Sequence, residues 1–270
     1  MIMKRLIYLS ILFVGFLVWS SCEKVIDVKL DTAPNQMVIE GNITDQNEAQ
    51  LIKISQSVPY TDQNVFPAVK GAKVTVTDDV GHLWTFEERE PGSYTSVPFK
   101  GISGRTYSLK VDVSNTQYTG ISIMPKRVHL DSLSLKVFTF GGKDVKQLQV
   151  HYNDPAAEVN QYRWVMKINN VQTKRVFVGN DRFTNGNNVA ELLYYSKDDD
   201  NKELLSGDEV QVEMQCIDKA IYNYWFTLSE QTKNGPGGGV TPGNPPSNIN
   251  HNALGYFSAH TTEKVSYKVK

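Results

Sequence analysis

The chain has 270 residues, of which 40% are hydrophobic and 21% are charged, a composition typical of a globular protein with one large domain or two medium-sized ones. Its 28 lysine and arginine residues nearly balance 29 acidic residues, and the formal net charge is −1. A chain with so little net charge lacks the long-range field that draws proteins to nucleic acid, so nucleic-acid binding is not expected.

The first segment, residues 1–21, predicts an export signal. Two basic residues precede an apolar run over residues 6–18, which has the length of the hydrophobic part of a signal peptide and is short for a membrane span. Two serines then precede Cys22. This junction, VWSSCE, resembles a bacterial lipoprotein signal, in which the cysteine is acylated and becomes the new N-terminus.

Cys22 has three possible states: a lipid anchor, half of a disulfide, or a free thiol. The second cysteine of the chain, Cys216, ends an alternating apolar and polar run over residues 209–216, which predicts a half-buried strand with Cys216 in the core. A disulfide is therefore not expected. Lipid attachment at Cys22 is favoured, and the alternative is a soluble exported protein that keeps a thiol there.

Residues 22–35 predict a tether, and residues 36–125 predict an immunoglobulin-like or transthyretin-like β-sandwich. Short alternating or β-branched runs recur at regular intervals, with turn residues between them. The strands expected in this domain cover residues 37–44, 51–57, 72–78, 83–88, 93–97, 106–114 and 118–124.

Residues 126–270 predict a second β-rich domain. Its expected strands cover residues 130–140, 146–152, 160–169, 173–179, 188–195 and 209–216, and two final strands, 253–260 and 264–270, are expected to return to the same sheet. The expected fold class is therefore mainly β, with two antiparallel β-sandwich-like domains.

The second domain also carries one predicted amphipathic helix over residues 218–233. Apolar residues at i, i+3, i+4 and i+7 from Ile221 share one face, and Asp218 can cap the N-terminus. Residues 234–248 are rich in glycine and proline and predict a loop, because such a segment buries too little apolar area to offset its ordering entropy.

Motifs for catalysis and for metal or cofactor binding do not stand out in the chain. The 5 histidines are dispersed, and no nucleophile elbow, P-loop or dinucleotide-binding fingerprint occurs. We therefore expect no enzyme activity, no catalytic residues, no cofactor and no metal. Asp198, Asp199 and Asp200 offer the oxygen ligands that calcium prefers, but the EF-hand spacing fails and a solvated loop is favoured.

Two short triplets, Asp31-Thr32-Ala33 and Asp131-Ser132-Leu133, resemble the O-glycosylation acceptor of Bacteroidota-type bacteria. Thr32 and Ser132 are the residues that would carry the glycan.

Several segments in a fixed order also resemble a family. They are CEKVIDVKLD, MVIEGNITDQ, GAKVTVTDDVG, EPGSYTS, GISGRTYSLKV and NPPSNI followed by ALGYFSAH. Together they are similar to Bacteroidota-type lipoproteins whose name records only a domain of unknown function, and the similarity runs from residue 22 to residue 260. It implies an outer-membrane lipoprotein that works with a TonB-dependent receptor. Glu23, directly after the cysteine, is similar to the acidic residues that favour display on the cell surface.

Three hypotheses for function follow. The leading one is a non-enzymatic accessory partner of a TonB-dependent transporter, with residues 234–248 as a contact segment. The contact residues proposed in it are Asn234, Pro236, Asn244, Pro245 and Pro246. The alternative is a surface lipoprotein that binds a glycan or peptide by itself through exposed aromatic residues, and a hydrolase with a deep pocket comes third. The aromatic candidates are Trp84, Tyr194 and Tyr195.

Overall fold

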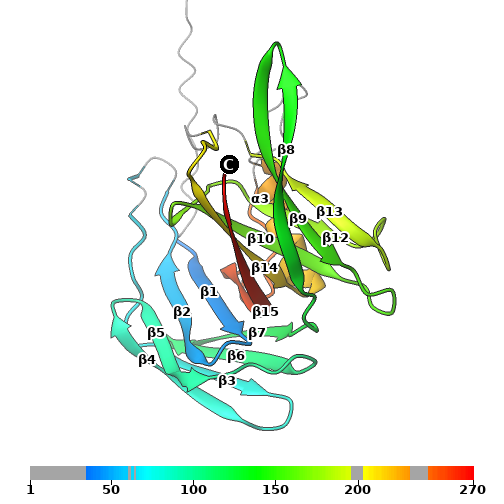
Figure 1. Ribbon diagram of the computed structural model, residues 1–270. Coiled ribbons are helices and arrows are strands. Elements are labelled where there is room, and N and C mark those ends of the chain that lie inside the picture. Colours follow the sequence, from blue (N-terminus) through cyan, green and yellow to red (C-terminus); the bar gives the residue numbers. More distant parts are fainter. Residues whose placement is uncertain (1–34, 60–61, 64, 196–202, 232–242) are drawn as a thin grey trace, which may run out of the picture. The chain divides into compact units, whose positions relative to one another are not determined.

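The computed structural model describes residues 35–59, 62–63, 65–195, 203–231 and 243–270. They lie within one compact unit that spans Asn35–Lys270 (Figure 1). The predicted signal, residues 1–21, and nearly all of the tether, residues 22–35, lie outside the described residues.

The described residues are mainly β, in two sheets with a single helix, as the sequence predicts. The first seven strands are β1 (Met37–Thr44), β2 (Glu48–Gln56), β3 (Lys73–Asp78), β4 (Leu83–Glu90), β5 (Ser93–Phe99), β6 (Thr106–Val113) and β7 (Thr116–Ile123). They are followed by β8 (Leu130–Phe140), β9 (Lys143–Asn153), β10 (Gln161–Ile168), β11 (Val171–Gln172), β12 (Phe177–Asn180), β13 (Asn188–Leu193), β14 (Glu209–Cys216), α3 (Lys219–Gln231) and β15 (Leu254–Lys268).

Alternating side chains explain why these segments form strands. In β6, Tyr107, Leu109 and Val111 are buried, whereas Lys110 between them is exposed. A strand places successive side chains on opposite faces, so this pattern buries one face and leaves the other in water. The same alternation runs through β10, where Trp164 and Met166 are buried.

The larger sheet has 12 strands, in the order β11-β10-β14-β15-β1-β2-β5-β4-β3-β6-β7, with β12 also paired to β10. The smaller sheet has 3 strands, in the order β13-β9-β8. Neighbouring strands in both sheets are antiparallel except β1 and β15, which run parallel from Val38↔Leu254 to Thr44↔His260. The antiparallel sandwich prediction therefore holds with this one exception.

β15 differs from the sequence prediction of two final strands at 253–260 and 264–270. It is one strand of 15 residues, whose first half pairs with β1 and whose second half pairs with β14. The polar residues in its middle, Thr261 and Thr262, are buried within the sheet and do not form a turn. One strand therefore joins the two halves of the chain.

Two hydrophobic cores lie on either side of this junction. One consists mainly of residues from β1 to β7, and β15 adds Phe257 and Ala259 to it. The other lies between the smaller sheet and strands β10 and β14, and Val265 and Tyr267 of β15 pack against it. The last strand therefore contributes to both cores, and the domain boundary expected between residues 125 and 126 stays a prediction.

The helix α3 packs against β10, β12 and β15. The Asp218 side chain accepts the backbone N–H of Ile221 at 3.0 Å, which confirms the predicted N-cap. Ile221 is buried with Ile217 and Tyr256 in a small cluster under the helix. The described part of the helix runs to Gln231, and the predicted end at residue 233 lies outside the described residues.

The hairpin of β8 and β9 extends beyond the rest of the smaller sheet (Figure 1). β13 pairs only with Leu148–Asn153 of β9, whereas the pairing of β8 with β9 continues to Phe140↔Lys143. The distal half of the hairpin therefore pairs only within itself. Residues 136–146, which end β8 and begin β9, form a two-stranded ribbon.

Candidate functional site

Several of the site residues suggested by the sequence lie outside the described part of the chain. Cys22, Thr32, Asn234 and Pro236 are among them, as are the acidic residues 198–200. Lipid attachment and glycosylation at Thr32 therefore stay predictions, as does the solvated loop favoured over a calcium site at residues 198–200.

The end of the Gly/Pro segment is described, and it is fastened to β15. The side-chain amide of Asn248 donates to the carbonyl of Phe257 at 2.7 Å, and its Oδ1 accepts the Phe257 N–H at 2.9 Å. Asn244 and Pro246 are exposed and Pro245 is half-buried. These three residues of the proposed contact segment therefore lie shortly before Asn248, which is held on β15 by its hydrogen bonds to Phe257.

Cys216 is confirmed as a core residue, with 2% of its surface exposed. The Val128 N–H donates to its Sγ at 3.3 Å. Burial raises the pKa of the Cys216 thiol, because a thiolate is poorly solvated in the core. The thiolate is the reactive form of cysteine, so this environment does not suit a nucleophile.

The three aromatic residues proposed for ligand binding are not brought together on one surface. Trp84 is half-buried and stacks on Phe99, with ring centroids 4.2 Å apart. Tyr195 is buried, whereas its neighbour Tyr194 is 56% exposed. Of the three, only Tyr194 offers an open ring.

A serine and histidine pair on the smaller sheet escaped the sequence analysis. The Ser134 hydroxyl on β8 lies 2.7 Å from Nε2 of His151 on β9. Ser132, the glycosylation candidate, is exposed and opposes the same histidine in register. A catalytic triad also needs a carboxylate that orients the histidine. Among the described residues, no hydrogen bond joins His151 to a carboxylate. Such a pair becomes visible only once strand register is known.

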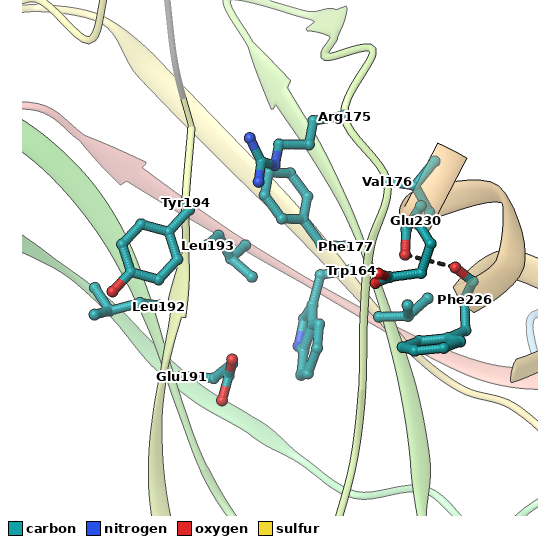
Figure 2. Close-up of a pocket in the computed structure, with 12 residues that line it drawn as sticks. Trp164, Arg175, Val176, Phe177, Glu191, Leu192, Leu193, Tyr194, Phe226 and Glu230 are labelled. Carbon is teal, nitrogen blue, oxygen red and sulfur yellow. Dashed lines mark hydrogen bonds between the residues drawn. The ribbon is translucent and has the colours of Figure 1, made fainter. Parts of the chain in front are cut away.

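A first cavity, of about 190 Å³, lies between α3, the segment leading into β12, and β13 (Figure 2). Figure 2 shows Glu191 and Tyr194 on one side, Phe226 and Glu230 of α3 on the other, and Trp164 between them. We call it the β13 cavity.

Two polar groups in the β13 cavity are removed from water to different degrees: Glu191 is half-buried, and the indole nitrogen of Trp164 is fully buried. Burial raises the pKa of Glu191, because the charged carboxylate is less well solvated there. The indole N–H of Trp164 is buried, and it has no hydrogen-bond partner among the residues that the structure describes. Buried donors normally have an acceptor, so this N–H departs from the usual pattern.

A second cavity, of about 400 Å³, lies on the other side of the segment that connects β11 to β12. Arg163 and Val165 of β10 form its floor, Trp225 and Leu228 of α3 cover it, and Trp164 lines it as well. We call it the arginine cavity. The sequence predicts a strand over residues 160–169 but contains no signal for which face of that strand the helix covers, so the cavity could not be expected from it.

The described part of the chain contains neither a candidate metal site nor a candidate membrane-spanning helix. None of its His, Cys, Asp and Glu residues gather in a group of three or more that could hold a metal ion. No helix in the same part is both long and apolar enough to cross a membrane.

Comparison with known proteins gives one result that covers nearly the whole chain. A family model described as a domain of unknown function, DUF4249, matches residues 23–266. No curated protein matches the chain.

Proposed function

Because the chain belongs to the DUF4249 family, which is defined only as a domain of unknown function, we propose a function from the features of the chain itself. The protein is a non-enzymatic outer-membrane lipoprotein, anchored through Cys22 and displayed on the cell surface. It acts as an accessory partner of a TonB-dependent transporter.

The observation that carries the partner role is the distal β8 and β9 hairpin. Val137 is 52% exposed and Val145 is 39% exposed, on a ribbon that no other described strand covers. Val137 opposes Lys146 and Val145 opposes Phe138, so the two valines lie on opposite faces of the ribbon. Exposed apolar groups on both faces of a projecting ribbon suit insertion into a partner more than packing against the chain's own core.

The lipid anchor is supported by the signal-like segment that ends at Cys22. Only about a dozen residues separate this cysteine from the compact unit, and an extended chain spans at most ~3.5 Å per residue. The scaffold would therefore stay within reach of a membrane-embedded partner.

The test is affinity purification of the tagged full chain from solubilised outer membrane. We expect a TonB-dependent transporter in stoichiometric amount with the wild-type chain, and its loss in the double variant Val137→Asp, Val145→Asp. Val80→Asp is the matched control, because Val80 is 61% exposed in the turn between β3 and β4.

Absence of a transporter from the wild-type preparation would refute the partner role. Equal recovery with the hairpin variant and with the control would show that the hairpin is not the contact. A third variant with residues 234–248 shortened tests the Gly/Pro segment by the same readout, and reduced recovery is expected if that segment touches the partner.

A second candidate, direct binding of a glycan or peptide, is favoured by one observation. Tyr194 is exposed at the rim of the β13 cavity, where a sugar ring or an aromatic side chain could stack on it. Replacement Tyr194→Ala should then abolish retention on a glycan or peptide array without affecting recovery of the transporter. Unchanged retention would remove this candidate.

A further inference from the structure

The arginine cavity contains a cation that no carboxylate of the described residues neutralises by an ion pair. Arg163 lies on the face of β10 that α3 covers, and its guanidinium carbon is 3.7 Å from the centroid of the Trp225 ring. One guanidinium nitrogen donates to Oε1 of Gln215 at 3.0 Å.

The acidic residue that acts electrostatically on Arg163, Glu213, has a partner of its own. Glu213 lies 3.3 Å from Nζ of Lys264 and also accepts the Gln215 amide at 2.7 Å. Burial lowers the pKa of Arg163, as expected of a guanidinium that is poorly solvated. A guanidinium has five N–H donors, and the single amide acceptor leaves most of them without a described partner.

The walls of the cavity combine this cation with apolar surface. Val165, Met166, Val176, Trp225 and Leu228 supply the apolar part. Lys174 and Arg175 also line the cavity, and no acidic residue is among the described residues that do so. Its volume of about 400 Å³ falls within the range of small-molecule sites, ~300–1,000 Å³.

These features together specify the chemistry of an occupant. Trp225 covers one face of the Arg163 guanidinium, which leaves the N–H edge of the guanidinium for a planar acceptor. A carboxylate matches such an edge in a bidentate pair. The apolar walls favour a ligand whose body carries no further charge. We propose that the arginine cavity binds a small apolar carboxylic acid, with its carboxylate on Arg163 and its body against Trp225 and Leu228.

The arginine cavity is separate from the hairpin, so this binding proposal goes beyond the partner role and does not depend on it. The proposal is tested by isothermal titration calorimetry of the purified full chain with phenylpropionate. Phenylpropanol serves as the neutral probe of the same shape. Phenylpropionate should bind saturably, and the alcohol should bind at least about tenfold more weakly, because hydrogen bonds to a charged group are lost.

The variant Arg163→Met should weaken phenylpropionate binding by about tenfold or more. The matched control is Arg182→Met, since Arg182 is an exposed arginine that also lies over an aromatic ring, 5.4 Å from the Phe183 centroid. It should bind the acid as the wild type does.

A cavity-filling variant, Val165→Phe, keeps Arg163 and should also abolish binding, so the test stands even if Arg163→Met does not fold. Equal binding of acid and alcohol would overturn the proposal, as would the absence of saturable binding at millimolar phenylpropionate. Wild-type affinity in Arg163→Met or in Val165→Phe would overturn it as well.

Discussion

Replacement of Gly255 by alanine tests the parallel pairing of β15 with β1. Gly255 has φ +89°, and a Cβ added there would lie 2.1 Å from the carbonyl oxygen of Ile39, its partner in β1. The positive φ costs an alanine roughly 1–2 kcal/mol. The backbone contact forces the two strands apart, and overpacking of this kind costs roughly 1–3 kcal/mol more. The expected loss in the free energy of unfolding is therefore about 2–5 kcal/mol.

Gly104 provides the control, because its φ is +85° and an added Cβ meets nothing within 4 Å. Gly104→Ala should lose only the backbone part, roughly 1–2 kcal/mol. Urea denaturation of both variants, with m-values compared, separates the two contributions. Equal losses in the two variants would contradict the close approach of Gly255 to β1.

Three further predictions concern protonation and anchoring. Burial lowers the pKa of His260 from 6.5 to about 4. The folded state should therefore lose stability as the pH falls from about 6.5 toward 4, because in this range the unfolded state binds a proton that the buried imidazole does not. Urea denaturation should show a loss of about 3 kcal/mol over this range that His260→Gln lacks. Burial would raise the pKa of Asp78, but hydrogen bonds from His82 and Arg105 lower it from 3.8 to about 2. In urea denaturation, Asp78→Asn should therefore lower the free energy of unfolding by about 2 kcal/mol at neutral pH. The wild type should lose this stability between about pH 4 and pH 2, and the variant should not. Cys22→Ala should move the protein from the membrane fraction to the soluble fraction, and unchanged membrane retention would argue against the lipid anchor.

The sequence was sufficient to predict most strands and the helix, because their signals are local. Alternation of buried and exposed residues located strands such as β6 and β14 to within a few residues. The helix followed from the spacing of Ile221 and its neighbours after Asp218. These signals depend on residues a few positions apart, so they do not require knowledge of the tertiary structure.

Features that depend on long-range pairing were not predicted. Two strands were expected at residues 253–260 and 264–270, yet Thr261 and Thr262 between them are buried where β15 changes partner from β1 to β14. The arginine cavity was missed for the same reason. Arg163 and Trp225 come together only because α3 covers the outer face of β10, and no local pattern indicates which face a helix covers.

Site-specific photo-crosslinking in intact cells tests the proposed partner role most directly. A photoreactive residue at Val137, in the distal hairpin, should give a covalent adduct with a TonB-dependent transporter. The same residue at Val80, which is 61% exposed in the turn between β3 and β4, should give none. Adducts of equal yield from both positions, or no transporter adduct from Val137, would contradict the account.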